Sequence, residues 1–596
     1  MSAVIDIKAP VEGVILRLES ALQEQVVEGQ TLAVLEVMKT HFSVLAPFSG
    51  VIDAVTCAVG DTVQRDALLF ALRADPKSRS TDAVIALGQR GGGEHSSIGP
   101  LARRVSESVD AGRVDQVAKR HQRGHRTARE NLADLVDGDS FIEYGQFALA
   151  AQRNREGISS LKTRTAADGV ITGTAKINRS LYGDGFADVA VVINDYTVLA
   201  GTQGFFHHKK IDRILQVASR RKLPIVMYTE GGGGRPGDTD VNVQIAGLNI
   251  TTWLVWSQLA GIVPRIAVNH GYCFAGNAAL FGGADITIAT KHSFIGMAGP
   301  AMIEGGGLGV FDAKKIGPTE VNAGNGVIDL VADDEAHATA LAKQVLGYFQ
   351  GQIIDWQVAD QTRLHSMMPE DRRFTYDVRA IIEVIADTGS FLEIQAGYAA
   401  GIIVGFMRIE GRPCALMAND NRVLGGAVGA ESAIKASRFL SLCSSFAIPL
   451  LSLCDTPGFM VGPDSEEQGA ARKMADLFTA GANFTAPLVT IFLRKAYGLG
   501  AMAMAGSSFV KPTYSAAWPM GEFGSMGLEG AVKLGFKHEL AAVEGDEREA
   551  LFNVLLKSLY EQGQAIEAAE FLEIDAVIEP SHTRRVAYTG LFSVGR

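Results

Sequence analysis

Lys39 lies midway between two copies of one short pattern, in a position that would expose its amine to modification. Residues 9–15 read Ala-Pro-Val-Glu-Gly-Val-Ile, and residues 46–52, which begin 37 positions later, read Ala-Pro-Phe-Ser-Gly-Val-Ile. Short alternating runs rich in Val and Leu surround both copies, which predicts two small interlocked sheets related by approximate two-fold symmetry. Residues 36–40, Glu-Val-Met-Lys-Thr, would then form the exposed turn that joins the two halves.

Two further pairs of small residues follow buried strands in the rest of the chain. Ala275-Gly276 and Gly500-Ala501 are 225 positions apart, and each pair lies where a short apolar run gives way to a helix of small residues. The first amides of a helix have no intrahelical partner, so they form a ready anion site. Glycine and alanine let a ligand oxygen approach those amides closely. The pattern therefore predicts two backbone anion sites, with Met502 directly after the second.

The 225-residue offset extends to the elements that must position these pairs. Residues 210–215 are echoed by 435–440, and residues 223–226 by 448–451. In each half, a helix is followed by a proline, a short buried strand and a loop. Strands that alternate with helices predict βαβ units in two related α/β domains.

The N-terminal segment resembles the biotinyl domain of biotin-dependent carboxylases, in which a Glu-x-Met-Lys turn carries biotin on the lysine. An isolated Met-Lys pair would read as an ordinary solvated lysine, but the symmetric repeat argues against that. Lipoyl domains share the fold and the symmetry, but they have Asp-Lys where this chain has Met38-Lys39. The resemblance implies biotin attached covalently to Lys39 by a biotin protein ligase.

Residues 101–596 resemble the carboxyltransferase subunit of acyl-CoA carboxylases. The matching motifs occupy residues 127–130, 435–439, 455–459, 494–498 and 583–585. The resemblance implies two crotonase-like domains and an active site shared between two protomers of a dimer. It also implies roles for the two pairs. The amides of Ala275 and Gly276 would hold the enolate oxygen of the acyl thioester, and those of Gly500 and Ala501 the biotin oxyanion.

These observations predict a multidomain chain with a small all-β flattened barrel followed by two α/β crotonase-like (ββα superhelix) domains. The expected boundaries are 1–73 for the biotinyl, or biotin carboxyl carrier, domain and 74–100 for a flexible linker rich in Gly and Ser. The N-terminal and C-terminal carboxyltransferase domains would occupy 101–350 and 351–596.

Other candidate residues allow ordinary structural explanations. The run Gly231 to Gly234 is similar to the glycine-rich loop of an ATP-grasp enzyme, but no lysine follows at a phosphate-cradling position, which favours a backbone turn. We retain four glycines and one methionine as candidate substrate-binding residues: Gly231, Gly232, Gly425, Gly426 and Met502. Glycine clusters are equally compatible with hinges. His207-His208 lacks further metal ligands, so no metal is expected. Lys210 and Lys435 are interpreted as salt-bridged helix residues without a catalytic part.

Composition limits the classes of function. The chain has 596 residues, of which 47% are hydrophobic and 20% charged, which indicates several packed globular domains. A net charge of −11 argues against a nucleic-acid partner. Five cysteines without metal spacing, and the lack of a signal-like start, favour reduced thiols in a cytoplasmic protein. Residues 245–263 are apolar but include several polar residues, which predicts a buried helix rather than a membrane span.

The leading hypothesis is the carboxyltransferase and biotin carrier component of an acyl-CoA carboxylase. It would move CO2 from carboxybiotin to the α-carbon of an acetyl, propionyl or longer aliphatic acyl-CoA. The expected partners are a separate biotin carboxylase subunit and a biotin protein ligase. The chain is expected to form a homo-oligomer, namely a hexamer, and to bind neither nucleic acid nor membrane. The alternatives are the same transferase in a biotin-dependent decarboxylase that runs in reverse, and, ranked last, a non-catalytic biotin carrier scaffold.

Overall fold

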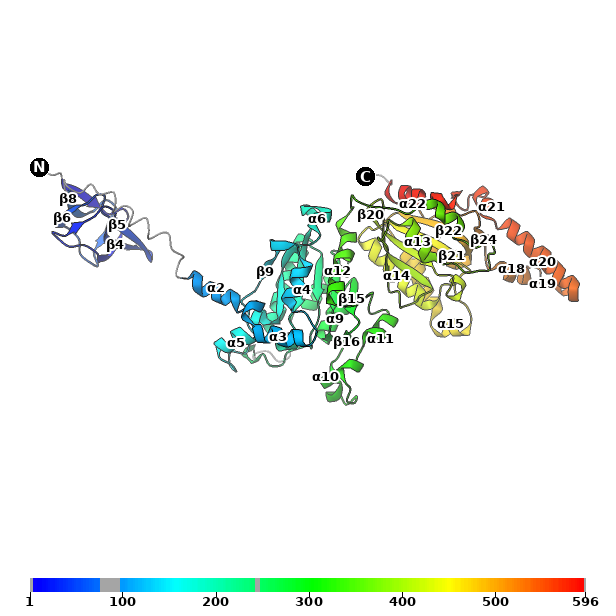
Figure 1. Cartoon of the computed structure of the whole chain (residues 1–596), viewed down its shortest axis with the longest axis horizontal. Coiled ribbons are helices and arrows are strands. Elements are labelled where there is room, and N and C mark those ends of the chain that lie inside the picture. Colours follow the sequence, from blue (N-terminus) through cyan, green and yellow to red (C-terminus); the bar gives the residue numbers. More distant parts are fainter. Residues whose placement is uncertain (1–3, 75–96, 242–246, 594–596) are drawn as a thin grey trace. The chain divides into compact units, whose positions relative to one another are not determined.

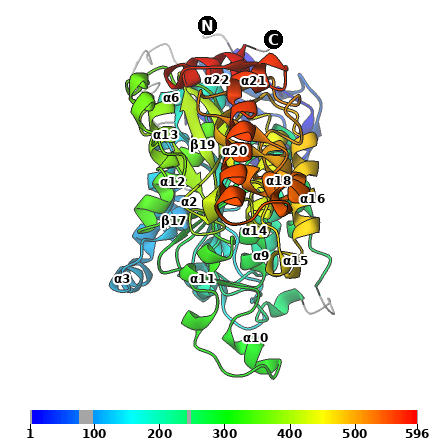
Figure 2. The same cartoon turned by 90° about the vertical axis from the view of Figure 1, so that its right-hand side faces the viewer.

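A computed structural model describes residues 4–74, 97–241 and 247–593. They form two compact units, Met1–Arg103 and Arg104–Arg596, shown in Figure 1 and turned by 90° in Figure 2. Most of the predicted linker, residues 75–96, lies outside the described residues. Its last residues belong to the helix α2, Ile98–Ser106.

The first unit consists of two four-stranded antiparallel sheets with strand orders β1-β8-β6-β3 and β5-β4-β2-β7. A shift of 37 positions turns β1–β4 into β5–β8, so each sheet takes two strands from each copy of the repeat. The predicted interlocked, two-fold arrangement is confirmed. The strands are β1 Val4–Lys8, β2 Gly13–Leu18, β3 Gln25–Val26, β4 Thr31–Val37, β5 Thr40–Leu45, β6 Gly50–Val55, β7 Thr62–Val63 and β8 Leu68–Ala74.

Equivalent side chains from the two copies fill the core of this unit. Ile15 and Ile52 are fully buried, and so are Leu35 and Leu72, each pair 37 positions apart. Alternation along β2 sends Ile15 inward and its neighbours Val14 and Leu16 to solvent, whereas β4 is buried from Leu32 to Leu35. Burying a Leu or Ile side chain contributes about 1.5–3 kcal/mol, so the repeat is also the main source of stability for this small unit.

The second unit contains two large mixed sheets with the same sequence of pairings. In each sheet the first two pairings are antiparallel and the remaining four along the path are parallel. The first sheet comprises β9 Ile142–Tyr144, β10 Val170–Lys176, β11 Asp188–Asn194, β12 Ile225–Tyr228, β13 Arg265–Asn269, β15 Ile286–Thr290 and β17 Leu330–Ala332. The second comprises β18 Leu392–Ile394, β19 Ile402–Ile409, β20 Arg412–Asn419, β21 Leu450–Thr456, β22 Leu488–Tyr497, β23 Tyr514–Ala517 and β25 Ala576–Val577, with β24 Glu522–Gly524 beside β22.

The register repeats as well. Ala190 pairs with Ile225 in the first sheet, and Ala415 pairs with Leu450 in the second, both shifted by 225 positions. The two predicted α/β domains of related architecture are therefore confirmed. Two short strands, β14 Tyr272–Phe274 and β16 Phe294–Gly296, pair in parallel as a separate small sheet. Along the chain, β14 follows β13 and β16 follows β15.

Helices connect and cover the strands. In the first half they are α3 Val114–Gln122, α4 Ala128–Leu135, α5 Ile158–Arg164, α6 Arg179–Tyr182, α7 Phe205–Arg221, α8 Thr252–Gln258, α9 Gly276–Gly282, α10 Pro300–Gly305, α11 Thr319–Gly324 and α12 Glu335–Gln350. In the second half they are α13 Val378–Ile385, α14 Ala430–Ser445, α15 Pro463–Glu467, α16 Ala470–Ala482, α17 Gly498–Met504, α18 Leu528–Gly535, α19 Lys537–Ala541, α20 Gly545–Gln562, α21 Ala565–Glu570 and α22 Thr583–Phe592.

The two long equivalent helices, α7 and α14, end in the same way. Lys222 at the end of α7 has φ 52°, and Ala447, 225 positions later and just beyond α14, also has φ 52°. Each is followed two residues later by a proline, Pro224 or Pro449, which cannot continue a helix. The chain therefore turns sharply into β12 or β21, and both strands are delivered to the centre of their sheets.

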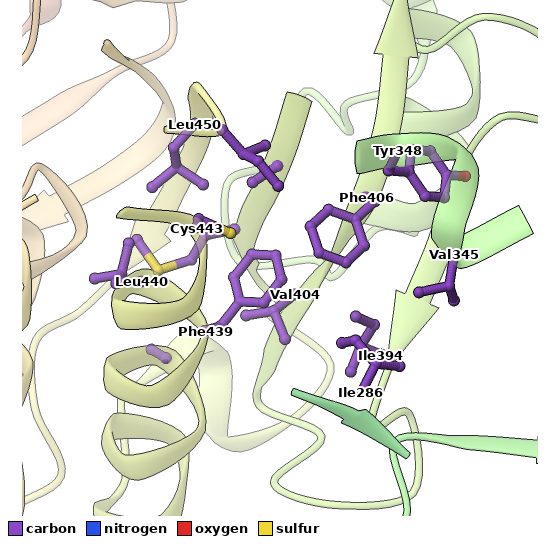
Figure 3. Packing of buried hydrophobic residues seen from close by; sticks show 14 of the residues in the cluster. Ile286, Val345, Tyr348, Ile394, Val404, Phe406, Phe439, Leu440, Cys443 and Leu450 are labelled. Carbon is purple, nitrogen blue, oxygen red and sulfur yellow. The ribbon is translucent and has the colours of Figure 1, made fainter. Parts of the chain in front are cut away.

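The two sheets share a hydrophobic core. Tyr348 of α12 stacks on Phe406 of β19 with ring centroids 5.3 Å apart, and Phe406 in turn contacts Phe439 of α14 (Figure 3). Figure 3 also shows Ile286 of the first sheet close to Ile394 of the second. Helix α12 packs on β13, β15 and β17 and also reaches β20. Packing across this boundary fixes the second unit as one body.

The apolar stretch 245–263 does not form the predicted buried helix. Residues 242–246 lie outside the described residues, and helix α8 covers only Thr252–Gln258, with Thr252 and Trp256 as its buried residues. Leu248 is 86% exposed and Leu254 56% exposed. Among the described residues, no helix combines the length and apolar composition needed to cross a bilayer.

Candidate active site

Lys39 occupies a two-residue hairpin turn between β4 and β5. Val37 pairs with Thr40, which leaves Met38 and Lys39 as the turn, with φ 48° and 66°. Positive φ at both central residues defines the turn type whose twist matches a hairpin. Met38 is 95% exposed and Lys39 is exposed beside it. The turn holds the Lys39 amine clear of the sheet, so an enzyme could attach a group there, and the position fits covalently bound biotin.

In the first half, the predicted pair Ala275-Gly276 lies at the start of α9. Ala275 is the N-cap residue and has φ 51° and ψ −120°, a backbone conformation that residues other than glycine rarely adopt. Such strain costs about 1–3 kcal/mol and is typical of functional sites. It turns the chain from β14 directly into the helix, so that the amide of Gly276 comes first in α9. No acceptor for that amide occurs among the described residues.

The prediction that Ala275 also supplies a free amide is wrong. Its N–H donates to the carbonyl of Gly296 at 3.1 Å, because β14 and β16 pair as parallel strands just before this point. Ala275 therefore provides the turn, and Gly276 provides the donor.

Gly276 lies in a slot between two side chains. A methyl group on Gly276 would overlap Oε1 of Gln203 and would stand 2.7 Å from Cζ2 of Trp253. The indole Nε1 of Trp253 donates to the Gly276 carbonyl at 3.4 Å. A side chain at position 276 would therefore have to push Gln203 or Trp253 aside.

The glycine loop that follows β12 is mostly occupied by its own contacts. The amide of Gly231 donates to Tyr272 and its carbonyl accepts from Phe274, while the amide of Gly232 donates to Ala200. A methyl group on Gly231 would overlap the carbonyl oxygen of Gly201. Two of the candidate substrate-binding glycines, Gly231 and Gly232, thus have backbone amides that already serve the fold.

Each half also buries a carboxylate where its central strand ends. Glu230 accepts two hydrogen bonds from Arg120, at 2.6 and 3.1 Å, and lies 3.1 Å from Nε2 of His270. Burial alone would raise the pKa of Glu230, but the charges of His270 and Arg120 outweigh it and hold that pKa at about 2. Its counterpart 225 positions later, Asp455, accepts from Arg494 at 3.0 Å and from the hydroxyl of Tyr376 at 2.8 Å.

In the second half, the helix start differs from the prediction. Helix α17 begins at Gly498, so Gly500 and Ala501 are its third and fourth residues rather than its first. The reason is that β22 continues to Tyr497 and Gly498, with φ 56°, turns straight into the helix. The amide of Gly500 still has no acceptor among the described residues. A methyl group on Gly500 would stand 2.5 Å from the backbone of Gly458.

A cavity of about 750 Å³ adjoins the start of α17. Gly498, Leu499 and Met502 line it from the helix, and Phe571 and Leu572 from the segment after α21. Gly500 and Ala501 are buried behind this surface. Met502, a candidate substrate-binding residue, is half-buried and lies in a cavity of mixed lining, with Phe571 and Leu572 on the apolar side and Glu567 and Glu573 on the polar side.

Gly425 and Gly426 occupy a tight turn with φ 64° and 91°. The carbonyl of Gly425 accepts from Nζ of Lys495 at 3.0 Å, and that of Gly426 accepts from Asn419 at 3.3 Å. Gly425 is exposed and Gly426 is buried. The turn is the counterpart of Ala200-Gly201 in the first half, so its geometry belongs to the repeat.

The buried lysines and histidines have structural partners. Lys210 donates to the carbonyls of Ala167 and Val170, and Lys435 donates to three carbonyls at 2.8–2.9 Å, so neither is salt-bridged as predicted. Burial lowers the pKa of each to about 8. His207 contacts the carbonyl of Asp168 at 3.0 Å. His208 contacts the hydroxyl of Thr252 at the same distance.

Within one chain, the two candidate sites do not share a cavity. The cavity beside α17 is lined only by residues between Ala496 and Glu573, whereas Gly276 lies in the first half among Gln203 and Trp253. Sequence reasoning missed Gln203 and Trp253, and it did not separate Glu230 from its glycine-rich neighbours. One signal was available, because position 203 carries Gln while its repeat partner, position 428, carries Val.

Comparisons with known proteins agree with this arrangement. A carboxyl transferase domain model matches residues 119–591, and a model for biotin-requiring enzymes matches residues 5–72. The chain is 33% identical over 518 residues to the propionyl-CoA carboxylase beta chain of Saccharopolyspora erythraea, covering 82% of this chain and 92% of that protein.

Two solved structures have a similar fold. A single-chain, multi-domain long-chain acyl-CoA carboxylase aligns with a TM-score of 0.80 and 44% identity, covering 98% of this chain but 56% of that one. The hexameric transcarboxylase 12S structure with methylmalonyl-coenzyme A aligns with a TM-score of 0.75 and 29% identity, covering 85% of this chain and 96% of that one.

Proposed function

The chain belongs to the carboxyl transferase family, and from that premise we propose that it is the carboxyltransferase and biotin carrier component of an acyl-CoA carboxylase. It would transfer a carboxyl group from biotin to the α-carbon of an acyl-CoA. The observation that carries the proposal is that one chain combines an exposed hairpin lysine in a symmetric β-unit with a duplicated transferase fold. No feature of the structure favours the reverse, decarboxylating direction or a scaffold without activity.

The carrier function is assigned to residues 1–73, and the transfer function to 101–350 and 351–596. Biotin on Lys39 would supply a ureido nitrogen that carries the carboxyl group and, once the group has left as CO2, takes up the proton lost from the α-carbon of the thioester. Because Lys39 lies at the tip of a hairpin, its side chain can be reached both by a ligase and by an active site.

Backbone amides would hold the reacting oxygens. The amide of Gly276 would donate to the thioester oxygen as negative charge develops there, and the amide of Gly500 would face the ureido oxygen of biotin. A preorganised donor of this kind contributes about 2.7–4 kcal/mol to a transition state. The strained Ala275, which joins β14 to α9, and the side chains of Gln203 and Trp253 around Gly276 preorganise the first donor.

Several parts of the assembly are proposals of the same kind. We propose a homo-oligomer, with a hexamer favoured by the hexameric assembly of the similar transcarboxylase. We also propose that a separate subunit carboxylates the biotin, that a biotin protein ligase attaches it, and that the protein is cytoplasmic. Met502, which lines this cavity together with Leu499 and Phe571, supports an aliphatic acyl group.

Biotin attachment tests the carrier assignment. After co-expression with a biotin ligase, the intact mass of the protein should show one biotin adduct, and Lys39→Arg should show none. Lys8→Arg, at the end of β1 in the same unit, is the matched control and should keep the adduct. An adduct that survives Lys39→Arg would refute the assignment.

A substrate panel tests the transferase assignment. The biotinylated protein is supplied with a biotin carboxylase, ATP and bicarbonate, and offered acetyl-, propionyl-, octanoyl- and palmitoyl-CoA. We expect carboxylation of at least one of these thioesters and none of free CoA. If none of the four thioesters is carboxylated, the proposed function is wrong.

A further inference from the structure

Gln203 carries a buried amide that the fold does not use. The residue is 3% exposed, yet neither Nε2 nor Oε1 has a hydrogen-bond partner among the described residues. Buried polar side chains almost always find partners, and an unpartnered amide lowers stability. A glutamine in this state indicates a group that is satisfied by something other than the chain itself.

The backbone of Gln203 fixes where the side chain can lie. Its N–H donates to Gly233 at 2.7 Å and its carbonyl accepts from Arg235 at 2.9 Å, so the residue is clamped against the glycine loop. Oε1 of the amide lies beside Gly276, close enough to exclude a methyl group there, and a half-turn of the amide about its last side-chain bond would put Nε2 in the same place. The unpartnered amide therefore lies next to the amide of Gly276, the first of the backbone donors at the start of α9 that have no acceptor among the described residues.

The second half of the chain shows that the fold does not require glutamine at this place. Val428, 225 positions later, makes the equivalent backbone bonds, donating to Gly458 and accepting from Met460, both at 3.0 Å. Val428 is 1% exposed and packs in the hydrophobic core, where its side chain needs no hydrogen-bond partner. An apolar side chain thus serves the same structural position, and the amide at 203 must have another use.

We propose that Gln203 is a substrate-contacting donor, whose Nε2 donates a hydrogen bond to the thioester carbonyl oxygen of the acyl-CoA beside the amide of Gly276. This inference rests on the proposed transferase function and adds a side chain to a site otherwise built from backbone. A neutral donor suits that place, because its hydrogen bond strengthens as the oxygen becomes an enolate and needs no counter-charge when the site is empty.

Two ligands that differ only in the carbonyl group provide the test. Propionyl-CoA has the thioester oxygen, and S-propyl-CoA, its thioether analogue, lacks it. Binding of both is measured by calorimetry on the full, biotinylated protein and on Gln203→Met, which keeps the side-chain length without hydrogen bonds. The wild type should prefer propionyl-CoA, and Gln203→Met should reduce that preference about tenfold, the factor that one hydrogen bond contributes. Gln203→Val, the residue of the second half, should behave in the same way.

Stability and rate supply the second readout. Because the amide is unpartnered in the free protein, Gln203→Met should keep or raise the melting temperature while carboxylation of propionyl-CoA falls by about 10²-fold. Thr490→Val is the matched control, since the Thr490 hydroxyl is also buried and unpartnered but lies in the second sheet. Thr490→Val should change the melting temperature but leave the rate of propionyl-CoA carboxylation unchanged.

The outcomes separate this proposal from the one on which it rests. If the wild type carboxylates an acyl-CoA but Gln203→Met keeps the full preference for propionyl-CoA over S-propyl-CoA, Gln203 is not a donor and the transferase assignment stands. If Gln203→Met weakens both ligands equally, or melts at a lower temperature, the residue is structural and the proposal is overturned. If the wild type neither binds nor carboxylates any thioester, both proposals fall.

Discussion

At the scale of single residues, buried charge holds the strand ends that carry the loops of the site. Glu230 ends the run after β12 and is tied to Arg120, which lies 110 positions earlier in α3. A buried ion pair of this kind stabilises only while both partners remain, because an isolated buried charge is costly. The carboxylate thus locks α3 onto the end of β12 and holds the glycine loop between Gly201 and Tyr272.

Replacing Glu230 with Gln should therefore destabilise the second unit. The change leaves the buried Arg120 without its ion-pair partner and leaves His270 with Glu335 alone, 3.6 Å away, at an expected cost of about 3 kcal/mol. Urea unfolding followed by fluorescence measures it, and Glu320→Gln, at an exposed position of α11, is the control. A loss below that of the control would show that the ion pair contributes no net stability.

The same carboxylate predicts an acid dependence. Its pKa is lowered from 4.5 to about 2 in the folded protein. A carboxylate with a depressed folded pKa contributes stability that is complete above pH 4.5 and is lost as the pH falls toward 2. Wild-type stability should accordingly drop more steeply than that of Glu230→Gln between those values. Equal slopes in urea titrations at pH 5, 4 and 3 would contradict this assignment.

At the scale of elements, one hairpin and two helix starts present the reacting groups. The β4–β5 turn holds Met38 and Lys39 at positive φ, a conformation that asparagine tolerates well and β-branched residues tolerate poorly. The starts of α9 and α17 both leave backbone amides without an acceptor among the described residues, but the preceding turns differ. Ala275 supplies a strained turn after β14, whereas Gly498 turns directly out of β22.

The turn geometry predicts opposite effects of two substitutions at Met38. Met38→Val should lower the stability of the first unit by about 1–2 kcal/mol, because a β-branched side chain resists the left-handed conformation. Met38→Asn should leave stability unchanged or slightly higher. Thermal unfolding of the biotinylated full chain, followed by circular dichroism, distinguishes them. If both variants melt together, the turn in solution is not the one described.

At the scale of the whole molecule, the structure places the two candidate donor sites in separate surroundings. Gly276 lies in the first half of the second unit, and the cavity beside α17 is lined by the second half alone. The dimer that the family resemblance implies would bring the first half of one protomer against the second half of its partner at two equivalent sites. We therefore propose that the complete site needs two chains.

Subunit mixing tests this arrangement. Gly276→Ala and Gly500→Ala should each be nearly inactive, because the added methyl groups displace Gln203 in one case and Gly458 in the other. Co-expression of the two variants should restore about a quarter of wild-type activity, since half of the dimers are hybrids and each hybrid keeps one intact site. Sedimentation verifies that both variants assemble. Mixtures as inactive as the separate variants would show that each site is built within one chain.

The sequence by itself determined the features that depend on local order and on repetition. The 37-residue repeat specified the interlocked sheets and the turn at Lys39, because alternation sets the face of each residue and the symmetry sets the pairing. The 225-residue repeat specified two matching α/β halves, since equivalent helices end at the same kind of residue before the same strand. The family resemblance rested on these same segments.

Only the tertiary structure decided which groups meet around the candidate site. The amide of Ala275, which was predicted to be a free donor, bonds to the carbonyl of Gly296. Helix α17 starts at Gly498, two residues before the predicted Gly500. The tertiary structure also brought Gln203 against Gly276, 73 positions away, and left the Gln203 amide without a partner. Such contacts depend on the paths of whole loops across the sheet, which periodicity does not encode. The repeat gave one hint, because position 203 carries Gln where the equivalent position in the second half, 428, carries Val.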